Sequence, residues 1–157
     1  MQKVNNLIAD KLCKLSSFLS HACKEFESIA KQIKEKNIRM SLRSFAIKTK
    51  QYSEELNSEL RTLRVIKILN RINYSQEIKS KPVAHKHFTD KKIIELCCNT
   101  EEYFVKAYRS ILNEYFPYTG LRDMLIYQLS GIKNAFRQLK LLKSVMTSET
   151  PVSEVLL

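Results

Sequence analysis

The sequence is poor in the residues that usually make turns. Its 157 residues include only two glycines and three prolines, and it contains no tryptophan. All-β and α/β folds need many turns, so this scarcity argues against both classes. The sequence also has no G-x-G or G-K-[ST] pattern, which excludes a glycine-rich phosphate-binding loop. Long helices with few connections are the fold class that remains.

Long apolar runs and cysteine frameworks are also missing. No stretch approaches the roughly 18 apolar residues of a membrane span, and residues 1–6 contain no apolar signal-peptide core. The cysteines lie inside helical patterns and not at framework spacings; they are Cys13, Cys23, Cys97 and Cys98. We therefore expect a cytoplasmic protein with free, mostly buried thiols.

The chain does contain an apolar pattern that steps by four, three, four and three residues. In the first segment this seam comprises Ile8, Leu12, Leu15, Leu19, Ala22, Phe26, Ile29 and Ile33. Such spacing places one apolar seam along a helix and requires partner helices. Three further segments repeat it, which predicts helices over about 3–35, 38–72, 90–116 and 120–146. Residues 1–146 then form one domain, and residues 147–157 form a mobile tail.

The predicted connections bear on the topology. A connection of two or three residues makes the first two helices an antiparallel hairpin, in which Asn37 is the expected turn or cap residue. Residues 73–89 lose the helical rhythm and contain Pro82. At about 3.3 Å per residue this linker is long enough to cross a bundle. Its length favours the long crossover of a ferritin-like four-helix bundle over an up-down-up-down arrangement, which stays open.

Polar residues interrupt the predicted seams. Thr49 and Glu59 lie on or beside the second seam, Glu101 on the third and Gln128 on the fourth. Polar groups inside a bundle are costly unless they are paired, protonated or bound to a ligand, so any activity is sought at these positions. Core packing accounts for the aromatic residues at helical spacing, which are Tyr52, Tyr103, Phe104, Tyr108, Tyr115 and Phe116.

The residues available for a metal site form an incomplete set. A ferritin-like di-iron site needs about four carboxylates and two Glu-x-x-His motifs, and none of His21, His85 and His87 lies three residues after a Glu. We therefore expect no catalytic residue and no cofactor, and we interpret Glu101 as a buried carboxylate held by Tyr, Gln or Lys.

Two weaker metal patterns remain. The His85-x-His87 pair could hold zinc together with Cys97 or Cys98, and His21 with Cys23 is a similar pair.

The chain is basic, with 27 Lys and Arg against 16 Asp and Glu and a net charge of +11. The cations are spread over every segment, and the densest stretch lies at residues 79–92. A solvated lysine-rich surface explains this distribution, because a nucleic-acid site needs a clustered face. Binding of nucleic acid or of an anionic membrane through residues 79–92 stays an alternative.

Several short helical motifs resemble those of a known family. They are FESIA at residues 26–30, QYSEEL at 51–56, EE at 101–102 with KAYR at 106–109, Gln128, and IK at 132–133. Over about residues 5–143 the chain resembles a bacterial family of ferritin-like four-helix bundles of unknown function. The resemblance implies a ferritin-like bundle, a cytosolic location and a stress-associated role.

The resemblance also points to positions of a metal site. Glu55 and Glu101 match the family's acidic positions, and Gln128 matches its glutamine in the fourth helix. Where family members often carry a Glu early in the first helix and a His late in the fourth, this chain has Cys23 and Phe136. The implied metal candidates are thus Glu55, Glu101 and Gln128, and the two departures argue against an inherited site.

We therefore predict an all-α, ferritin-like four-helix bundle made of two antiparallel helical hairpins joined by a long linker. The preferred function is a non-enzymatic structural or interaction module with a protein partner, such as a second copy in a homodimer. The first alternative is a degenerate iron or manganese protein that uses Glu55, Glu101 and Gln128. The second is a basic protein that binds nucleic acid or an anionic membrane.

Overall fold

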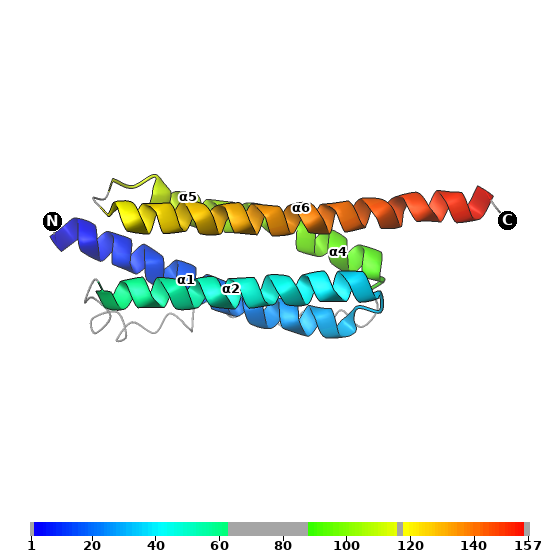
Figure 1. The fold of residues 1–157 in the computed structure, drawn as a ribbon, viewed down its shortest axis with the longest axis horizontal. Coiled ribbons are helices and arrows are strands. Elements are labelled where there is room, and N and C mark those ends of the chain that lie inside the picture. The colour runs from blue at the N-terminus through cyan, green and yellow to red at the C-terminus, as the bar shows by residue number, and fades with distance from the viewer. Residues whose placement is uncertain (1, 63–87, 116–117, 156–157) are drawn as a thin grey trace.

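The chain folds into helices. In a computed structural model the backbone is described for residues 2–62, 88–115 and 118–155, and it contains no strand within those ranges. The helices are α1 (Gln2–Gln32), α2 (Lys36–Thr62), α4 (Asp90–Cys98), α5 (Glu101–Leu112) and α6 (Thr119–Val155) (Figure 1). The predicted all-α class is therefore confirmed. Among the described residues, no helix is long and apolar enough to cross a membrane.

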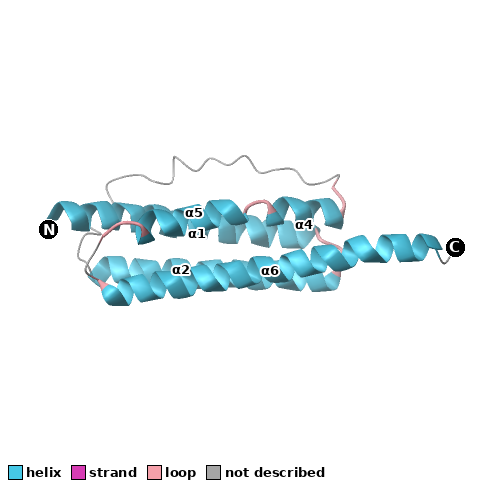
Figure 2. Cartoon of the chain, turned by 90° about the horizontal axis from the view of Figure 1, so that it is seen from above, coloured by secondary structure: helices cyan, strands magenta, loops and turns pink. Residues whose placement is uncertain are grey.

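The helices form two layers. Helices α2 and α6 lie side by side in one layer, and α1 lies with α4 and α5 in the other (Figure 2). Helix α1 packs against α2 and α5, while α6 packs against α2, α4 and α5. Because α4 and α5 follow one another along the same line, the five helices fill four positions around one core.

Contacts at the two ends of the bundle define the helix directions. The backbone N–H groups of Lys34 and Glu35 donate to the Asp90 carboxylate at 3.2 and 2.9 Å, so α4 begins beside the α1–α2 connection. At the other end, Lys11 donates to the Ser110 carbonyl at 3.0 Å, which places the end of α5 beside the first half of α1. Helix α2 thus ends far from the point where α4 begins (Figure 1).

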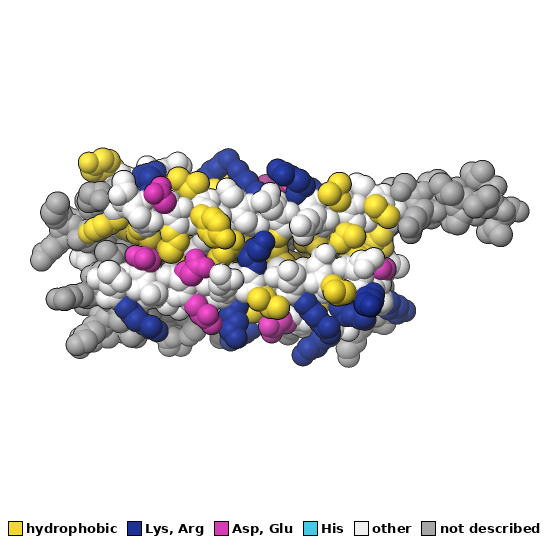
Figure 3. Space-filling model, viewed as in Figure 1, with side chains coloured by type: hydrophobic (Ala, Val, Ile, Leu, Met, Phe, Trp, Pro, Cys, Tyr) yellow, Lys and Arg dark blue, Asp and Glu magenta, His cyan; other side chains and the backbone are white. Residues whose placement is uncertain are grey.

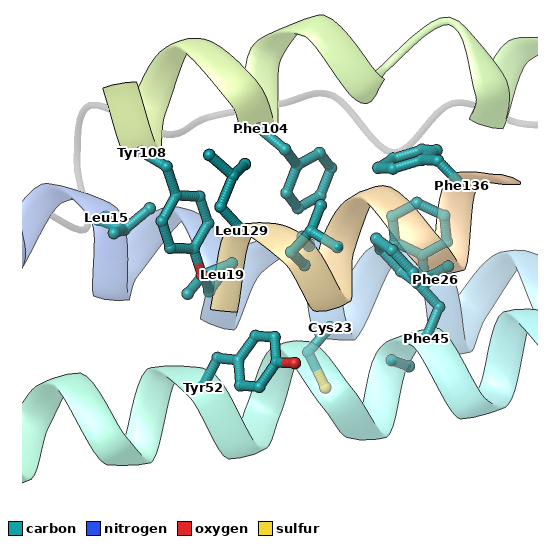
Figure 4. Packing of buried hydrophobic residues seen from close by; sticks show 14 of the residues in the cluster. Leu15, Leu19, Cys23, Phe26, Phe45, Tyr52, Phe104, Tyr108, Leu129 and Phe136 are labelled. Carbon is teal, nitrogen blue, oxygen red and sulfur yellow. The ribbon is translucent and has the colours of Figure 1, made fainter. Parts of the chain in front are cut away.

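The predicted seams form the core. The seam residues of α1 from Ile8 to Ile33 are buried, as are Leu42, Leu56 and Leu125 of the facing helices. At the centre lie Phe26, Phe45, Phe104 and Phe136, one from each position of the bundle, with ring centroids 4.4–6.4 Å apart (Figure 4). Each ring meets the edge or the tilted face of another, which is the preferred aromatic geometry.

The turn between α1 and α2 differs from the prediction. Helix α1 ends at Gln32 and not near residue 35, and α2 begins at Lys36. The side chain of Glu35 accepts a hydrogen bond of 2.8 Å from the N–H of Ile38, so Glu35 caps α2 and the predicted cap, Asn37, lies inside the helix. A carboxylate at this position also complements the positive end of the helix dipole, which a neutral amide does less well.

The predicted helix over 90–116 is two helices. It starts as predicted, with the Thr89 hydroxyl accepting from the N–H of Lys92 at 3.2 Å. At Thr100 both the N–H and the hydroxyl bond to the Cys97 carbonyl, at 3.1 and 2.7 Å. These three-residue steps replace the α-helical pattern and separate α4 from α5, which then ends at Leu112.

Two further boundaries concern residues near the C-terminal end and the linker. The fourth helix does not stop at residue 146, because α6 continues to Val155. The predicted mobility of residues 147–157 stays a prediction. Residues 63–72 of the second predicted helix and the linker through residue 87 lie outside the described residues.

Two tyrosines predicted in the core are on the surface. Tyr103 is 58% exposed and Tyr115 is 86% exposed, whereas Tyr52, Phe104 and Tyr108 are buried as predicted. The prediction for Tyr115 assumed one continuous helix, but α5 ends at Leu112 and the seam ends at Ile111. Phe116 lies outside the described residues.

Candidate functional site

A buried polar network joins three helices at Gln128. Its side chain is fully buried on α6. The amide oxygen accepts a hydrogen bond of 2.9 Å from the hydroxyl of Tyr108 on α5. The amide nitrogen lies 3.2 Å from the Glu55 carboxylate and 3.4 Å from the Tyr52 carbonyl, both on α2. Both ends of this interrupting side chain are therefore used inside the protein.

The protonation state of Tyr108 suits its place in this network. Burial is the main cause that raises the pKa of the Tyr108 hydroxyl, and Tyr52 and Glu55 raise it further. A hydroxyl with a raised pKa remains a neutral donor over the physiological range. The side chain therefore donates to Gln128 and does not act as an ionised base.

Glu101, the third predicted metal candidate, does not join Glu55 and Gln128. Its carboxylate pairs with Lys140 of α6, and the side chain is partly exposed. Glu101 precedes Tyr108 by seven residues, or about two helical turns of about 5.4 Å each. The expectation of a buried carboxylate is therefore wrong: Glu101 opens the helix α5 just after the break, at the edge of the bundle. The expected lysine partner is confirmed.

The other interruptions of the second seam are satisfied locally. Thr49 is fully buried, and its hydroxyl donates to the Ala46 carbonyl in the same helix at 2.8 Å. Leu60 is buried in the seam, while Glu59 beside it is only half-buried. Neither Thr49 nor Glu59 contributes to the Gln128 network.

A second polar cluster, not predicted from the sequence, lies between α1 and α2. The hydroxyls of Ser16 and Ser53 are 2.9 Å apart, and both residues are buried. The Ser16 hydroxyl also lies 2.8 Å from the Asn57 side-chain oxygen, and the Ser53 hydroxyl donates to the Ser16 carbonyl at 3.0 Å. Serines next to a seam were the available signal. These contacts crosslink the hairpin and leave no open group for a ligand.

The cysteines are free, and three of the four are buried. Burial raises the pKa of the Cys97 thiol to about 12, with smaller contributions from Cys98 and Glu25. Burial likewise raises the pKa values of Cys23 and Cys98. A thiol with a raised pKa is a poor nucleophile and a poor metal ligand at neutral pH.

The weaker metal patterns are not brought together by the fold. His21 lies 3.9 Å from Glu25, while the Cys23 thiol lies 3.7 Å from Glu27. His85 and His87 lie outside the described residues. Within the described ranges, no three His, Cys, Asp or Glu side chains are close enough to hold a metal ion.

The outer face of α6 carries a second stripe with the same spacing as the core seams. We call it the second seam; its residues are Met124, Tyr127, Gly131, Asn134, Gln138, Leu141 and Val145. None of them is charged, and the three largest exposed ones are Tyr127 at 66%, Leu141 at 61% and Val145 at 52% exposure. Figure 3 shows hydrophobic side chains gathered along α6 on this face.

Comparison of the chain with family models, with curated proteins and with solved structures finds no match in any of the three.

Proposed function

We propose that the chain is a non-enzymatic, ferritin-like four-helix bundle that acts as a cytoplasmic structural or interaction module. The helix directions support the ferritin-like assignment. Neighbouring helices run antiparallel, and α2 ends at the opposite end of the bundle from the start of α4, so their connection has to return along the bundle (Figure 1). A single long crossover of this kind is characteristic of ferritin-like bundles. The stress-associated role implied by the family resemblance belongs to the same proposal.

The observation that carries the proposal is the occupied amide of Gln128. In a ferritin-like metal site, side chains from facing helices converge on the ion. Here the corresponding side chain of α6 bonds to Tyr108 on one side and to Glu55 and the Tyr52 carbonyl on the other. Its hydrogen bonds hold α2, α5 and α6 together, which is a structural role.

Metal reloading tests this proposal against the degenerate metalloprotein. The protein is stripped of metal, incubated with Fe²⁺ or Mn²⁺, desalted and subjected to elemental analysis. We expect far less than one metal ion per chain in the wild type, in Glu55→Ala and in the matched control Glu54→Ala. A stoichiometric metal ion that is lost in Glu55→Ala and kept in Glu54→Ala would overturn the proposal.

A second candidate function, nucleic-acid binding, is supported by one end of the bundle. The exposed cations at this basic end are Lys31, Lys34, Lys36, Lys91 and Lys92. The two nearby carboxylates are used by the backbone: Asp90 accepts from the N–H groups of residues 34 and 35, and Glu35 accepts from the N–H of Ile38. Neither carboxylate pairs with a lysine in these contacts, which leaves the cations available to phosphates.

Salt dependence tests this second function. If the basic end binds a single-stranded oligonucleotide, affinity falls steeply with salt, with a log–log slope of about −0.7 per phosphate neutralised. The double variant Lys91→Ala and Lys92→Ala should then bind more weakly than a control double variant, Lys24→Ala and Lys106→Ala. Equal loss in both double variants, or tighter binding to anionic vesicles than to the oligonucleotide, would remove this candidate.

A further inference from the structure

We propose that the second seam is the interface of a homodimer, in which α6 of two copies packs antiparallel about a two-fold axis near Asn134. This inference rests on the proposed role as an interaction module and names the partner as a second copy of the chain. It commits to one surface and to one relative orientation of the two helices.

The spacing of the second seam is that of a helix with a partner helix. Steps of three and four residues recur from Met124 to Val145 without a break. This stretch spans about 30 Å at about 1.5 Å per residue. Within one chain the core seam of α6 already packs against α2 and α5. The second seam is a separate apolar and uncharged stripe, and such a stripe at this spacing pairs with another helix.

The second seam is complementary to itself when it is reversed. In an antiparallel pair centred on Asn134, Tyr127 lies opposite Leu141 of the partner subunit, and Met124 lies opposite Val145 of the partner subunit. Large apolar side chains therefore meet at both ends of the contact. Asn134 meets the partner's Asn134 at the axis, where two amides can donate and accept reciprocally. A two-fold interface requires this kind of self-complementarity.

Charge also favours this face for self-association. The chain carries a net charge of +11, so most contacts between two copies bring cations together. The second seam contains no charged residue, and contact through it buries no unpaired charge. The adjoining face of α2 carries charges of both signs (Figure 3). Two copies can therefore approach here with the least repulsion.

The exposed aromatic residue provides the anchor. Tyr127 stacks edge-on with the buried Tyr52, at a centroid distance of 6.4 Å, so its ring is supported from below while most of it faces solvent. A supported tyrosine loses little conformational freedom when it is buried, and tyrosine is enriched in interface centres. Tyr127 and Leu141 are accordingly the residues to change.

Sedimentation and light scattering test the dimer. We expect a wild-type dimer at about 100 µM protein. The double variant Tyr127→Glu and Leu141→Glu should be monomeric with unchanged helicity by circular dichroism. The control double variant Ile47→Glu and Tyr103→Glu removes two equally exposed apolar side chains from other faces, 65% and 58% exposed, and should remain dimeric. A monomeric wild type, or a control that dissociates as fully as the seam variant, would overturn the inference.

Disulfide trapping tests the axis without disturbing the fold. In a Cys13→Ser background, Asn134→Cys should form a disulfide-linked dimer under mild oxidation, because the two copies of residue 134 face each other. Arg137→Cys, on the same helix but off the second seam, is the control and should stay monomeric on a non-reducing gel. Crosslinking through residue 137 and not through residue 134 would show that another face mediates association.

The two proposals fail separately. If the metal-reloading experiment finds a stoichiometric ion while the second-seam variants behave as expected, the interaction-module proposal is wrong as a complete account and the dimer stands. If no metal binds and the wild type is monomeric, the dimer is wrong and the non-enzymatic reading stands.

Discussion

The hydroxyl group of Tyr52 lies against the backbone of Gly131, so close that a Cβ atom added at residue 131 would be 2.0 Å from the hydroxyl oxygen. The contact joins α2 to α6 beside the Gln128 network. Glycine inside a helix costs about 1 kcal/mol relative to alanine. The fold accepts this cost here because the Tyr52 ring occupies the space that a side chain would fill. The close helix approach predicted at Gly131 is therefore confirmed.

The first prediction concerns this contact. Gly131→Ala should lower the free energy of unfolding by about 1 kcal/mol, because overpacking costs about 1–3 kcal/mol and the gain in helix propensity offsets about 1 kcal/mol of it. In a Tyr52→Phe background the nearest atom to the new methyl group is the ring carbon at 3.1 Å. There the same substitution should be neutral or stabilising. Urea unfolding of the four proteins in this double-mutant cycle measures the difference.

Gly120 supplies the control for that cycle. It also lies in α6, and a Cβ atom there would have no atom within 4 Å. Gly120→Ala should be neutral or stabilising in both backgrounds. If Gly131→Ala has the same effect with and without the Tyr52 hydroxyl, the hydroxyl is not the group that requires glycine.

The second prediction concerns the Gln128 network. Gln128→Leu leaves the buried Tyr108 hydroxyl without its acceptor and should cost about 1–3 kcal/mol of stability. Tyr108→Phe alone should also destabilise. The double variant should be more stable than the sum of the two single effects implies, with a coupling of about 0.5–3 kcal/mol. Glu55→Ala is the control, since Glu55 is half-buried and water can replace its contact. Additive single effects would contradict a direct Tyr108–Gln128 bond.

The sequence was sufficient to predict the buried seams and the all-α class. Apolar spacing depends on helix geometry alone, so residues such as Leu12 and Leu56 are buried where the pattern places them. The pattern also predicts that Gln128 is buried. It does not predict which side chains meet, because that depends on the relative register of helices far apart in the chain. For this reason Glu55 and Gln128 meet, whereas Glu101 pairs with Lys140.

The errors have local causes. The seam was extended to Tyr115 across residues 99 and 100, where hydrogen bonds from Thr100 end the α-helical pattern. Asn37 was favoured as the cap on residue type, but the Glu35 side chain reaches the N–H of Ile38. The second seam has the same four-three spacing as the core seams. The mixture of Asn134 and Gln138 with apolar residues concealed it, since the search was for continuous apolar seams.

The third prediction concerns stability at alkaline pH. The folded-state pKa of Cys97 is raised from 9.0 to about 12, mainly by burial. A thiol that ionises only in the unfolded chain favours unfolding once the pH exceeds 9.0. Stability is therefore full below that pH and falls as the pH rises toward the folded-state pKa. At pH 10 we expect Cys97 to account for a loss of about 1 kcal/mol relative to pH 8.

Urea unfolding at pH 8 and pH 10 measures this loss, with Cys97→Ala as the comparison. The variant is less stable at both pH values because it leaves a cavity, but its decline between them should be smaller than that of the wild type. Part of the decline should remain in the variant, since burial also raises the pKa values of Cys98 and Tyr52. Equal declines in the two proteins would show that the Cys97 thiol ionises in the folded state.

The fourth prediction separates stability from binding at the basic end. The first turn of α2 contains no acidic residue and begins with Lys36, whose charge opposes the positive end of the helix dipole. Lys36→Glu should therefore raise the free energy of unfolding by about 0.3–1 kcal/mol at low salt, and less at high salt because exposed charges are screened. If the basic end binds nucleic acid, the same substitution weakens oligonucleotide binding. Lys50→Glu makes the same charge change at an exposed position inside α2 and should not stabilise the helix. A gain in stability with unchanged oligonucleotide binding would assign the lysines of this end to a solvated surface, because a phosphate contact cannot survive the reversal of its charge.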